Sequence, residues 1–338
     1  MRLLVLFAQS RIQELQDTKE EAQKEAYTHL EAINKITENQ KEKLERVVVK
    51  RTKEIRDANE QLAEKNQEII DSITYAKRIQ EAILPADEFF FSKLPNAFIN
   101  YMPKDIVAGD FYWMESFQNP DDDTEEIILF AAADCTGHGV PGAMVSVVCS
   151  NALNRSVREY GLYHPNQILD KAAMIVEETF SQSNNDVKDG MDISLCAYYP
   201  KQQKLEWAGA NNPLYIVSKH ESSIEFDREL LDDRFPANLF EIKADKQPIG
   251  KYENRKPYTL HTIPLKAGDT IYSFSDGFAD QFGGEKGKKY KTKKMKEFLI
   301  SIYNHPINEH NVLLKWEFTD WRGDLEQLDD VCVIGFRV

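Results

Sequence analysis

The first 84 residues lack both glycine and proline, although the chain of 338 residues contains 15 glycines and 13 prolines. Both residue types are costly in a helix interior, so their absence over this length predicts a continuous helix that ends at Pro85. We therefore divide the chain into a helical signalling segment, residues 1–84, and a compact domain, residues 85–338.

The chain also lacks a basic excess, a long apolar run and paired cysteines. Its 42 Lys and Arg are outnumbered by 56 Asp and Glu, so we expect no nucleic-acid partner, because such partners require a basic footprint. The apolar run from Leu3 to Ala8 is too short to span a bilayer. The four cysteines form no C-x-x-C pair and indicate buried free thiols. We expect a cytoplasmic protein, membrane-associated if the natural chain extends upstream.

Apolar residues recur in the first segment at alternating spacings of three and four, which is typical of a coiled coil. Two phases are separated by a stutter near residues 40–44. They contain Ile12, Leu15, Ala22, Ala26, Ile33 and Ile36, then Leu44, Val48, Ile55, Ala58 and Leu62. The pattern predicts a parallel homodimer through residues 12–84, weakened by polar core positions such as Lys19 and His29. The alternative is a lone helix packed on its own domain.

After Pro85 the strand-like runs outnumber the helix-like runs and often follow one another directly. Helix-like runs cover Pro141–Tyr160, Pro165–Ser181 and Lys291–Asn304. This order favours an α+β fold with antiparallel sheets flanked by helices over a doubly wound parallel sheet.

Several aspartates stand where an apolar strand meets a turn. They are Asp110 in GDFYW, Asp134 in AAADCTGHG, Asp276 in YSFSDGF, and Asp329 and Asp330 in LDDVCVIGF. Each alone is compatible with ordinary turn chemistry. Together at sheet ends they would repel one another, and a divalent cation would remove that cost. Oxygen ligands select Mg²⁺ or Mn²⁺ over zinc.

The segments GDFYW, DCTGHGVPGA, AGANNPLYIV, SDGFADQFGG and DDVCVIG stand in the order of a known family. Over about residues 70–338 the chain resembles the SpoIIE/RsbU-like branch of the metal-dependent type 2C serine/threonine protein phosphatases. The helical lead-in SITYAKRIQEAILP is similar as well. The resemblance implies an αββα sandwich with a centre of two Mn²⁺ or Mg²⁺ ions at one end of the paired sheets.

The resemblance also implies a role for each motif residue. Asp134 matches the aspartate that bridges both metals, and Cys135 would ligate through its backbone carbonyl. Asp110 matches the aspartate near one metal, whereas Asp276 and Asp329 match ligands of the other. Asp330 is the alternative to Asp329 if the register differs by one residue.

Other positions are less settled. Asp189 and Asp192 fall near a third metal site of some relatives, although a turn and a strand start explain them as well. His138 stands two places beyond the histidine that some relatives use as a general acid, and it either orients water or phosphate or caps the next helix. No arginine matches the relatives' phosphate-binding arginine. Lys104 is a candidate phosphate contact or a solvated lysine.

The resemblance implies hydrolysis of phosphoserine and phosphothreonine by a metal-activated water, with catalysis resting on Asp134, Asp276 and His138. The expected substrate is a phosphorylated protein, in bacterial partner-switching a small anti-sigma-factor antagonist, and we expect regulation through the coiled coil. The alternative is a catalytically inactive scaffold that acts through coiled-coil binding. A nucleotide cyclase would require a different motif order.

Overall fold

The computed structural model describes residues 1–181, 189–219, 226, 228–230 and 236–338. The described chain divides into two compact units, Met1–Asp71 and Ser72–Val338. Helix α1, Arg2–Glu81, continues through the boundary between them. The predicted glycine-free helix is confirmed, and it ends four residues before Pro85. The functional division at residue 84 remains a prediction.

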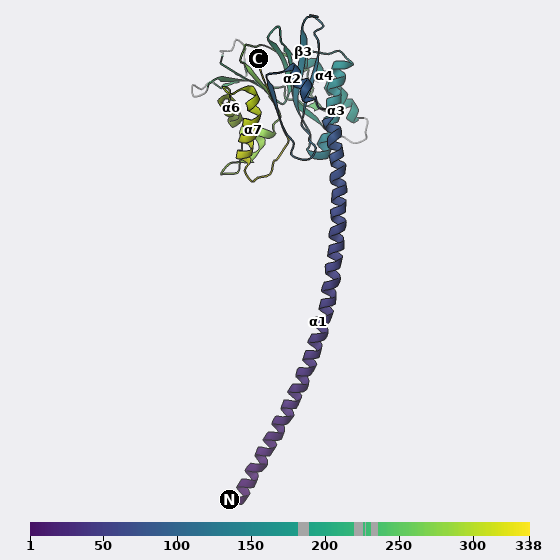
Figure 1. Cartoon of the computed structure of the whole chain (residues 1–338), viewed down its shortest axis with the longest axis vertical. Coiled ribbons are helices and arrows are strands. Elements are labelled where there is room, and N and C mark those ends of the chain that lie inside the picture. Colours follow the sequence, from purple (N-terminus) through teal and green to yellow (C-terminus); the bar gives the residue numbers. More distant parts are fainter. Residues whose placement is uncertain (182–188, 220–225, 227, 231–235) are drawn as a thin grey trace. The chain divides into compact units, whose positions relative to one another are not determined.

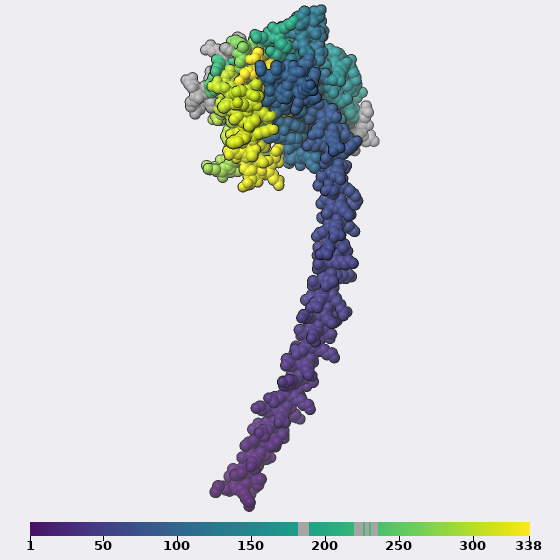
Figure 2. Space-filling model, viewed as in Figure 1, coloured from purple at the N-terminus to yellow at the C-terminus, as the bar shows by residue number. Residues whose placement is uncertain are grey.

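The first unit is a single helix whose side chains are exposed along its length (Figure 2). The apolar positions of the predicted coiled coil are among them; Ile12, Ile33 and Leu62 are each more than half exposed. A row of apolar side chains facing water is costly, and it favours a partner over a solvated single helix. None of the helices in the described part of the chain has an apolar stretch of the length that a bilayer crossing requires.

The second unit contains two six-stranded sheets and a small hairpin. The helices after α1 are α2 (Asp87–Lys93), α3 (Gly139–Arg158), α4 (Pro165–Ser181), α5 (Gly277–Asp280), α6 (Lys291–Ser301) and α7 (Ile307–Arg322). The first sheet contains β1 (Ala97–Met102), β14 (Val331–Arg337), β11 (Thr270–Phe274), β6 (Leu214–Ser218), β8 (Asn238–Ile242) and β7 (Arg228–Leu230), in that order.

The second sheet contains β10 (His261–Pro264), β5 (Lys204–Ala210), β4 (Gly190–Tyr199), β3 (Glu126–Cys135) and β2 (Phe111–Gln118), with β9 (Ile249–Gly250) paired to β4. The hairpin joins β12 (Phe282–Gly283) to β13 (Lys288–Lys289). All described strand pairs in both sheets are antiparallel.

Side-chain alternation along the strands creates the layers. In β3, Ile127, Leu129 and Ala131 belong to the core beneath α3 and α4, whereas Ile128 and Phe130 belong to the core between the two sheets. A strand that is apolar on both faces must be covered on both. Helices α3 and α4 lie on one side of the sheets, and α6 and α7 on the other (Figure 1). The predicted α+β sandwich of two antiparallel sheets flanked by helices is therefore confirmed.

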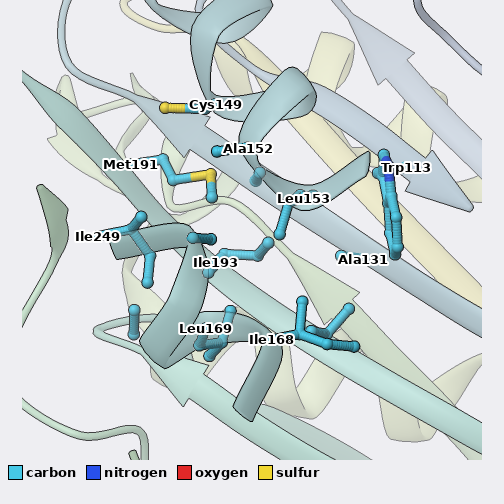
Figure 3. Packing of buried hydrophobic residues seen from close by; sticks show 14 of the residues in the cluster. Trp113, Ala131, Cys149, Ala152, Leu153, Ile168, Leu169, Met191, Ile193 and Ile249 are labelled. Carbon is cyan, nitrogen blue, oxygen red and sulfur yellow. The ribbon is translucent and has the colours of Figure 1, made fainter. Parts of the chain in front are cut away.

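The core beneath α3 includes apolar residues from the start of β4. Cys149, Ala152 and Leu153 of α3 pack in one cluster with Met191 and Ile193 of β4 (Figure 3). All five are at most 1% exposed. This packing holds the middle of α3 against the start of β4.

Three helices of the second unit were not predicted, α2, α5 and α7, of which α5 has only four residues. Helix α2 has only seven residues, with three phenylalanines in a row, too short for a periodic signal. Helix α7 buries His310, Leu314 and Phe318 at a spacing of four, a signal that the sequence does contain. The apolar pattern of Tyr258–Ile263 predicts a strand from residue 258, but the strand forms only over β10.

The packing of the two sheets predicts a large cost for Phe130→Ala. Phe130 is fully buried between the sheets and contacts the Phe336 ring at 6.1 Å between centroids. Its truncation is expected to lower the free energy of unfolding by about 3–5 kcal/mol. Urea unfolding measures this change, with Phe282→Ala as the matched control because Phe282 is 44% exposed. Equal effects of the two substitutions would contradict the sandwich packing.

Candidate metal centre

Two sheets end at the same place and bring four aspartates together. Asp134 is the penultimate residue of β3, and it pairs in register with Asp192 of β4. Asp110 directly precedes β2, whose first residue, Phe111, pairs with Ala133 of β3. Asp110 and Asp134 therefore lie on neighbouring strands of one sheet.

The other two aspartates come from the second sheet. Asp276 follows β11 by two residues and Asp329 precedes β14 by two residues. Strands β11 and β14 are antiparallel neighbours in which Phe274 pairs with Val333, so the end of one strand meets the start of the other. The four motif aspartates thus converge as predicted, because antiparallel pairing places strand ends and strand starts at one edge.

A pocket of about 290 Å³ opens at this edge. Four carboxylates line it, those of Asp134, Asp192, Asp276 and Asp329. The remaining lining residues are Cys135, Thr136, Gly137, His138, Gly190, Met191, Pro248, Ile249 and Gly250. Asp110 lies behind the pocket, 2% exposed, and its Oδ2 has no hydrogen-bond partner among the described residues.

The gathered carboxylates raise one another's pKa. Burial, followed by the charges of Asp276, Asp329 and Asp192, raises the pKa of Asp134 to about 8. Partial burial and the charges of Asp280 and Asp329 raise the pKa of Asp276 to about 6, although this side chain keeps more contact with solvent than Asp134. Without a counter-charge the site therefore holds protons at neutral pH.

The pKa of Asp110 is raised well above its usual range. Burial is the main cause and the neighbouring Asp134 charge is the second, while a hydrogen bond with Ser275 acts in the opposite direction. A buried carboxylate oxygen without a donor is costly unless something else pairs with it.

These residues fit a divalent cation. The donors are carboxylate and carbonyl oxygens, the ligands that Mg²⁺ and Mn²⁺ prefer, and the orphaned Asp110 Oδ2 is a site for a missing positive partner. In the described part of the chain, no three Asp, Glu, His or Cys side chains already form a complete ligand set. Backbone carbonyls and water would supply the remaining ligands.

Cys135 turns its thiol away from the carboxylates. Its side chain belongs to the core beneath α3, where its free thiol contacts the free thiol of Cys149. Burial and this contact raise the pKa of the Cys135 thiol well above its usual range. The residue nevertheless lines the pocket, so its backbone is the part that faces the site. This orientation supports the expected carbonyl ligand.

The two adjacent aspartates Asp329 and Asp330 have different surroundings. Asp330 is 1% exposed, and its two oxygens accept hydrogen bonds from the backbone N–H groups of Lys104 and Gly109, each at 2.7 Å. Asp329 lines the pocket. This difference favours Asp329 as the ligand and gives Asp330 the task of holding the loop that leads to Asp110.

Close backbone contacts maintain this arrangement. A Cβ on Gly277 would lie 1.9 Å from the carbonyl oxygen of Asp330, and a Cβ on Gly109 would lie 2.3 Å from that of Gly137. Neither position has room for a side chain. The glycines next to the aspartates therefore allow segments from different strands to touch.

Three further predicted residues have identifiable partners. Asp189 accepts a hydrogen bond from Thr136 Oγ1 at 2.9 Å, and Asp192 accepts one from Asn211 Nδ2 at 2.8 Å. His138 occupies the N-cap position of α3, but its side chain makes no capping hydrogen bond. Instead its Nδ1 lies 3.0 Å from Asp105 Oδ2 and its Nε2 lies 3.1 Å from Lys104 Nζ.

The sequence did not reveal the role of Gln80. This residue of α1 is 5% exposed; its Nε2 donates to Ala108 O at 2.5 Å and to Ser146 Oγ at 3.0 Å, and its Oε1 accepts from Ala108 N at 3.1 Å. Ala108 stands two residues before Asp110. A glutamine is ordinary on a solvated helix, so only its buried surroundings identify it.

Comparison with known proteins identifies the family. The family model of stage II sporulation protein E (SpoIIE) matches residues 124–338. The chain belongs to the SpoIIE family. This family is a branch of the PP2C phosphatases, which supports a serine/threonine phosphatase of bacterial signalling. No match was found among curated proteins.

Solved structures agree with the SpoIIE assignment. The SiaA-PP2C domain of Pseudomonas aeruginosa is 28% identical, with a TM-score of 0.66 over 81% of this chain and 98% of that domain. The PP2C phosphatase domain of SpoIIE from Bacillus subtilis, solved with a fragment of its regulatory domain, is 19% identical, with a TM-score of 0.52 over 72% of this chain and 61% of that one.

The RsbU and RsbW domains of Rv1364c from Mycobacterium tuberculosis are 18% identical to the SpoIIE-family chain, with a TM-score of 0.50 over 72% of this chain and 60% of that one. At these identities the likeness of the last two structures shows the fold. The similarity extends upstream of the family-model match, since 81% of the chain aligns with the SiaA domain.

The raised pKa values predict how the metal-free protein responds to pH. A carboxyl group with a pKa near 3.8 when unfolded and about 8 when folded, as for Asp134, makes the folded state bind more protons. Stability is therefore lost as pH rises from about 4 through about 8. Asp134→Asn removes this loss, so in EDTA its Tm is expected to exceed that of the native protein by an amount that grows from pH 5 to pH 8.

Thermal unfolding with and without Mn²⁺ checks this prediction. Mn²⁺ is expected to raise the Tm of the native protein and to leave Asp134→Asn almost unchanged, because ligand binding stabilises only the form that binds it. Asp324→Asn, in an exposed loop, is the control and should follow the native protein in every condition. A Tm difference that does not grow with pH would contradict the carboxylate cluster.

Proposed function

We propose that this protein is a Mg²⁺- or Mn²⁺-dependent phosphatase that hydrolyses phosphoserine and phosphothreonine in a protein substrate. The convergence of Asp134, Asp276 and Asp329 in one pocket, with the unpaired Asp110 oxygen behind it, carries the proposal. Buried carboxylates that are this close together lower the stability of the fold unless a cation neutralises them. Their presence in one pocket therefore supports cation binding.

The proposed division of labour follows the surroundings of each residue. The charges of Asp276 and Asp329 act on Asp134, and the charge of Asp134 acts on Asp110, so Asp134 is the candidate bridge between two ions. Asp276 and Asp329 would complete one ion's ligands, and Asp110 with the Cys135 carbonyl would complete the other's. When bound, the ions would acidify a water molecule and neutralise the phosphoryl oxygens.

The pocket itself favours a phosphoryl group presented on a larger partner. It opens to the surface at the strand ends, and Pro248, Ile249 and Gly250 border it beside the carboxylates. Of the similar solved structures, one contains a PP2C domain with a fragment of its regulatory domain, and another contains RsbU and RsbW domains. We propose bacterial partner-switching as the context and a phosphorylated anti-sigma-factor antagonist as the substrate.

Regulation through the first helix is part of the proposal. Helix α1 is continuous into the second unit, where Gln80 binds the backbone of Ala108 through both the nitrogen and the oxygen of its side-chain amide. A rotation or shift of the helix end would therefore move the segment that leads to Asp110. In this proposal a change in the coiled coil alters the position of one metal ligand.

Metal-dependent turnover is expected to depend on the carboxylates. The substitutions Asp134→Asn and Asp276→Asn keep side-chain size but remove charge. Hydrolysis of p-nitrophenyl phosphate in Mn²⁺ should fall by at least about 100-fold in each, since even outer-shell substitutions cost about 10–100-fold. Asp324→Asn is the matched control. Turnover without metal, or turnover that survives the double substitution, would exclude the proposed mechanism, whereas no turnover of the native protein in Mn²⁺ would favour the inactive scaffold.

The proposed homodimer is expected to depend on the apolar seam of residues 12–84. Ile55→Lys together with Leu62→Lys places two charges in that seam. Sedimentation equilibrium at micromolar concentration should then show a monomer, whereas the native chain should sediment as a dimer. Val49→Lys is the control, because Val49 is 70% exposed and lies off the seam. A native monomer, or a dimer that tolerates both seam charges, would contradict the coiled coil.

A further inference from the structure

The described side chains that line the pocket include several carboxylates and no basic group other than a histidine. Four aspartates line it, and among the described lining residues none is lysine or arginine. A phosphoryl group arrives with its own negative charge, so a fixed cation at the rim would favour its binding. His138 lines the pocket and contacts a side chain that can supply this cation.

Lys104 lies next to His138. Its Nζ is 3.1 Å from His138 Nε2, and His138 Nδ1 is 3.0 Å from Asp105 Oδ2. An ammonium group has only donors, so Nε2 must accept its hydrogen bond. The ring proton is then on Nδ1 and is donated to Asp105. Each member of the series Lys104, His138, Asp105 therefore has one defined role.

The backbone of Lys104 is fixed as well. Its N–H donates to Asp330 Oδ1 at 2.7 Å, and the other oxygen of Asp330 accepts from Gly109 N. Asp330 directly follows the proposed ligand Asp329. The same buried carboxylate thus sets the positions of the loop carrying Lys104 and of the segment before Asp110. A solvated lysine would need none of these constraints.

We propose that the Lys104 ammonium group binds a phosphoryl oxygen of the substrate at the pocket rim, and that His138 and Asp105 are positioning residues that hold it there. The assignment deepens the proposed function and rests on it for the identity of the substrate. It supplies the phosphate contact for which the sequence offers no arginine.

The test compares Lys104→Met and Lys104→Arg with the native full-length protein. Lys104→Met should raise the KM for p-nitrophenyl phosphate and the Kd for inorganic phosphate in Mg²⁺ by about tenfold, the loss of one charge-assisted hydrogen bond. Lys104→Arg should recover most of this loss. The Mg²⁺ concentration for half-maximal activity should stay within about twofold, because the carboxylate ligands are intact.

Two further variants separate positioning from structure. His138→Ala should weaken phosphate binding in the native background and add little in Lys104→Met, as expected of residues that act as one unit. Lys315→Met removes the same charge from the exposed face of α7 and should leave phosphate binding unchanged. Independent effects of His138→Ala and Lys104→Met would overturn the positioning role.

Direct binding keeps this inference distinct from the proposed function. Titration calorimetry with inorganic phosphate requires no turnover. Phosphate binding that depends on Lys104 in a protein without phosphatase activity would support the anchor and refute the enzyme. Equal phosphate affinity in the native protein and Lys104→Met, or no phosphate binding by the native protein, would overturn the inference.

Discussion

Repulsion between carboxylates at the shared end of two sheets is the constraint on which the rest of this structure depends. Asp134 receives the charges of its neighbours from both sheets, and burial adds to them. Like charges in a low-dielectric site cannot all ionise without a counter-charge. The fold must therefore supply enough packing elsewhere to hold these groups together, and the two sheets, buried on both faces, supply it.

The scaffold around the carboxylates consists largely of backbone contacts. Asp330 holds the loop before Asp110 through two N–H groups, and Ser275 Oγ accepts from Cys332 N at 2.9 Å while also bonding to Asp110. Gly277 and Gly109 allow the segments to approach closely. Backbone contacts suit this task because they keep a ligand in place whether or not a cation neutralises it.

The segment before Asp110 is held by hydrogen bonds from two different parts of the fold. Gln80 fixes Ala108 from the side of the helix, and Asp330 fixes Lys104 and Gly109 from the side of the last strand. In the functional proposals, the Gln80 contact connects the metal ligand Asp110 to the regulatory helix α1. The Asp330 contacts connect Asp110 to Lys104, which would bind the substrate. The short segment 104–110 is thus a point where input, metal and phosphate can influence one another, since each contact restrains the same backbone.

The long helix, the antiparallel sheets and the aspartates at strand ends could be predicted from the sequence, because glycine and proline placement and strand patterning are local signals. The tertiary structure decided which of two adjacent aspartates faces the pocket, and it gave buried partners to Gln80 and fixed partners to His138. Helix α7 was missed although its buried residues recur every fourth position. Asp329 and Asp330 are the same residue type at adjacent positions. They differ in the hydrogen bonds that Asp330 accepts from the N–H groups of residues 104 and 109, more than 200 positions away. Hydrogen bonds between residues far apart in the chain produce no periodic pattern in a single sequence. For this reason the carboxylates could be predicted, whereas the residues that hold them in place could not.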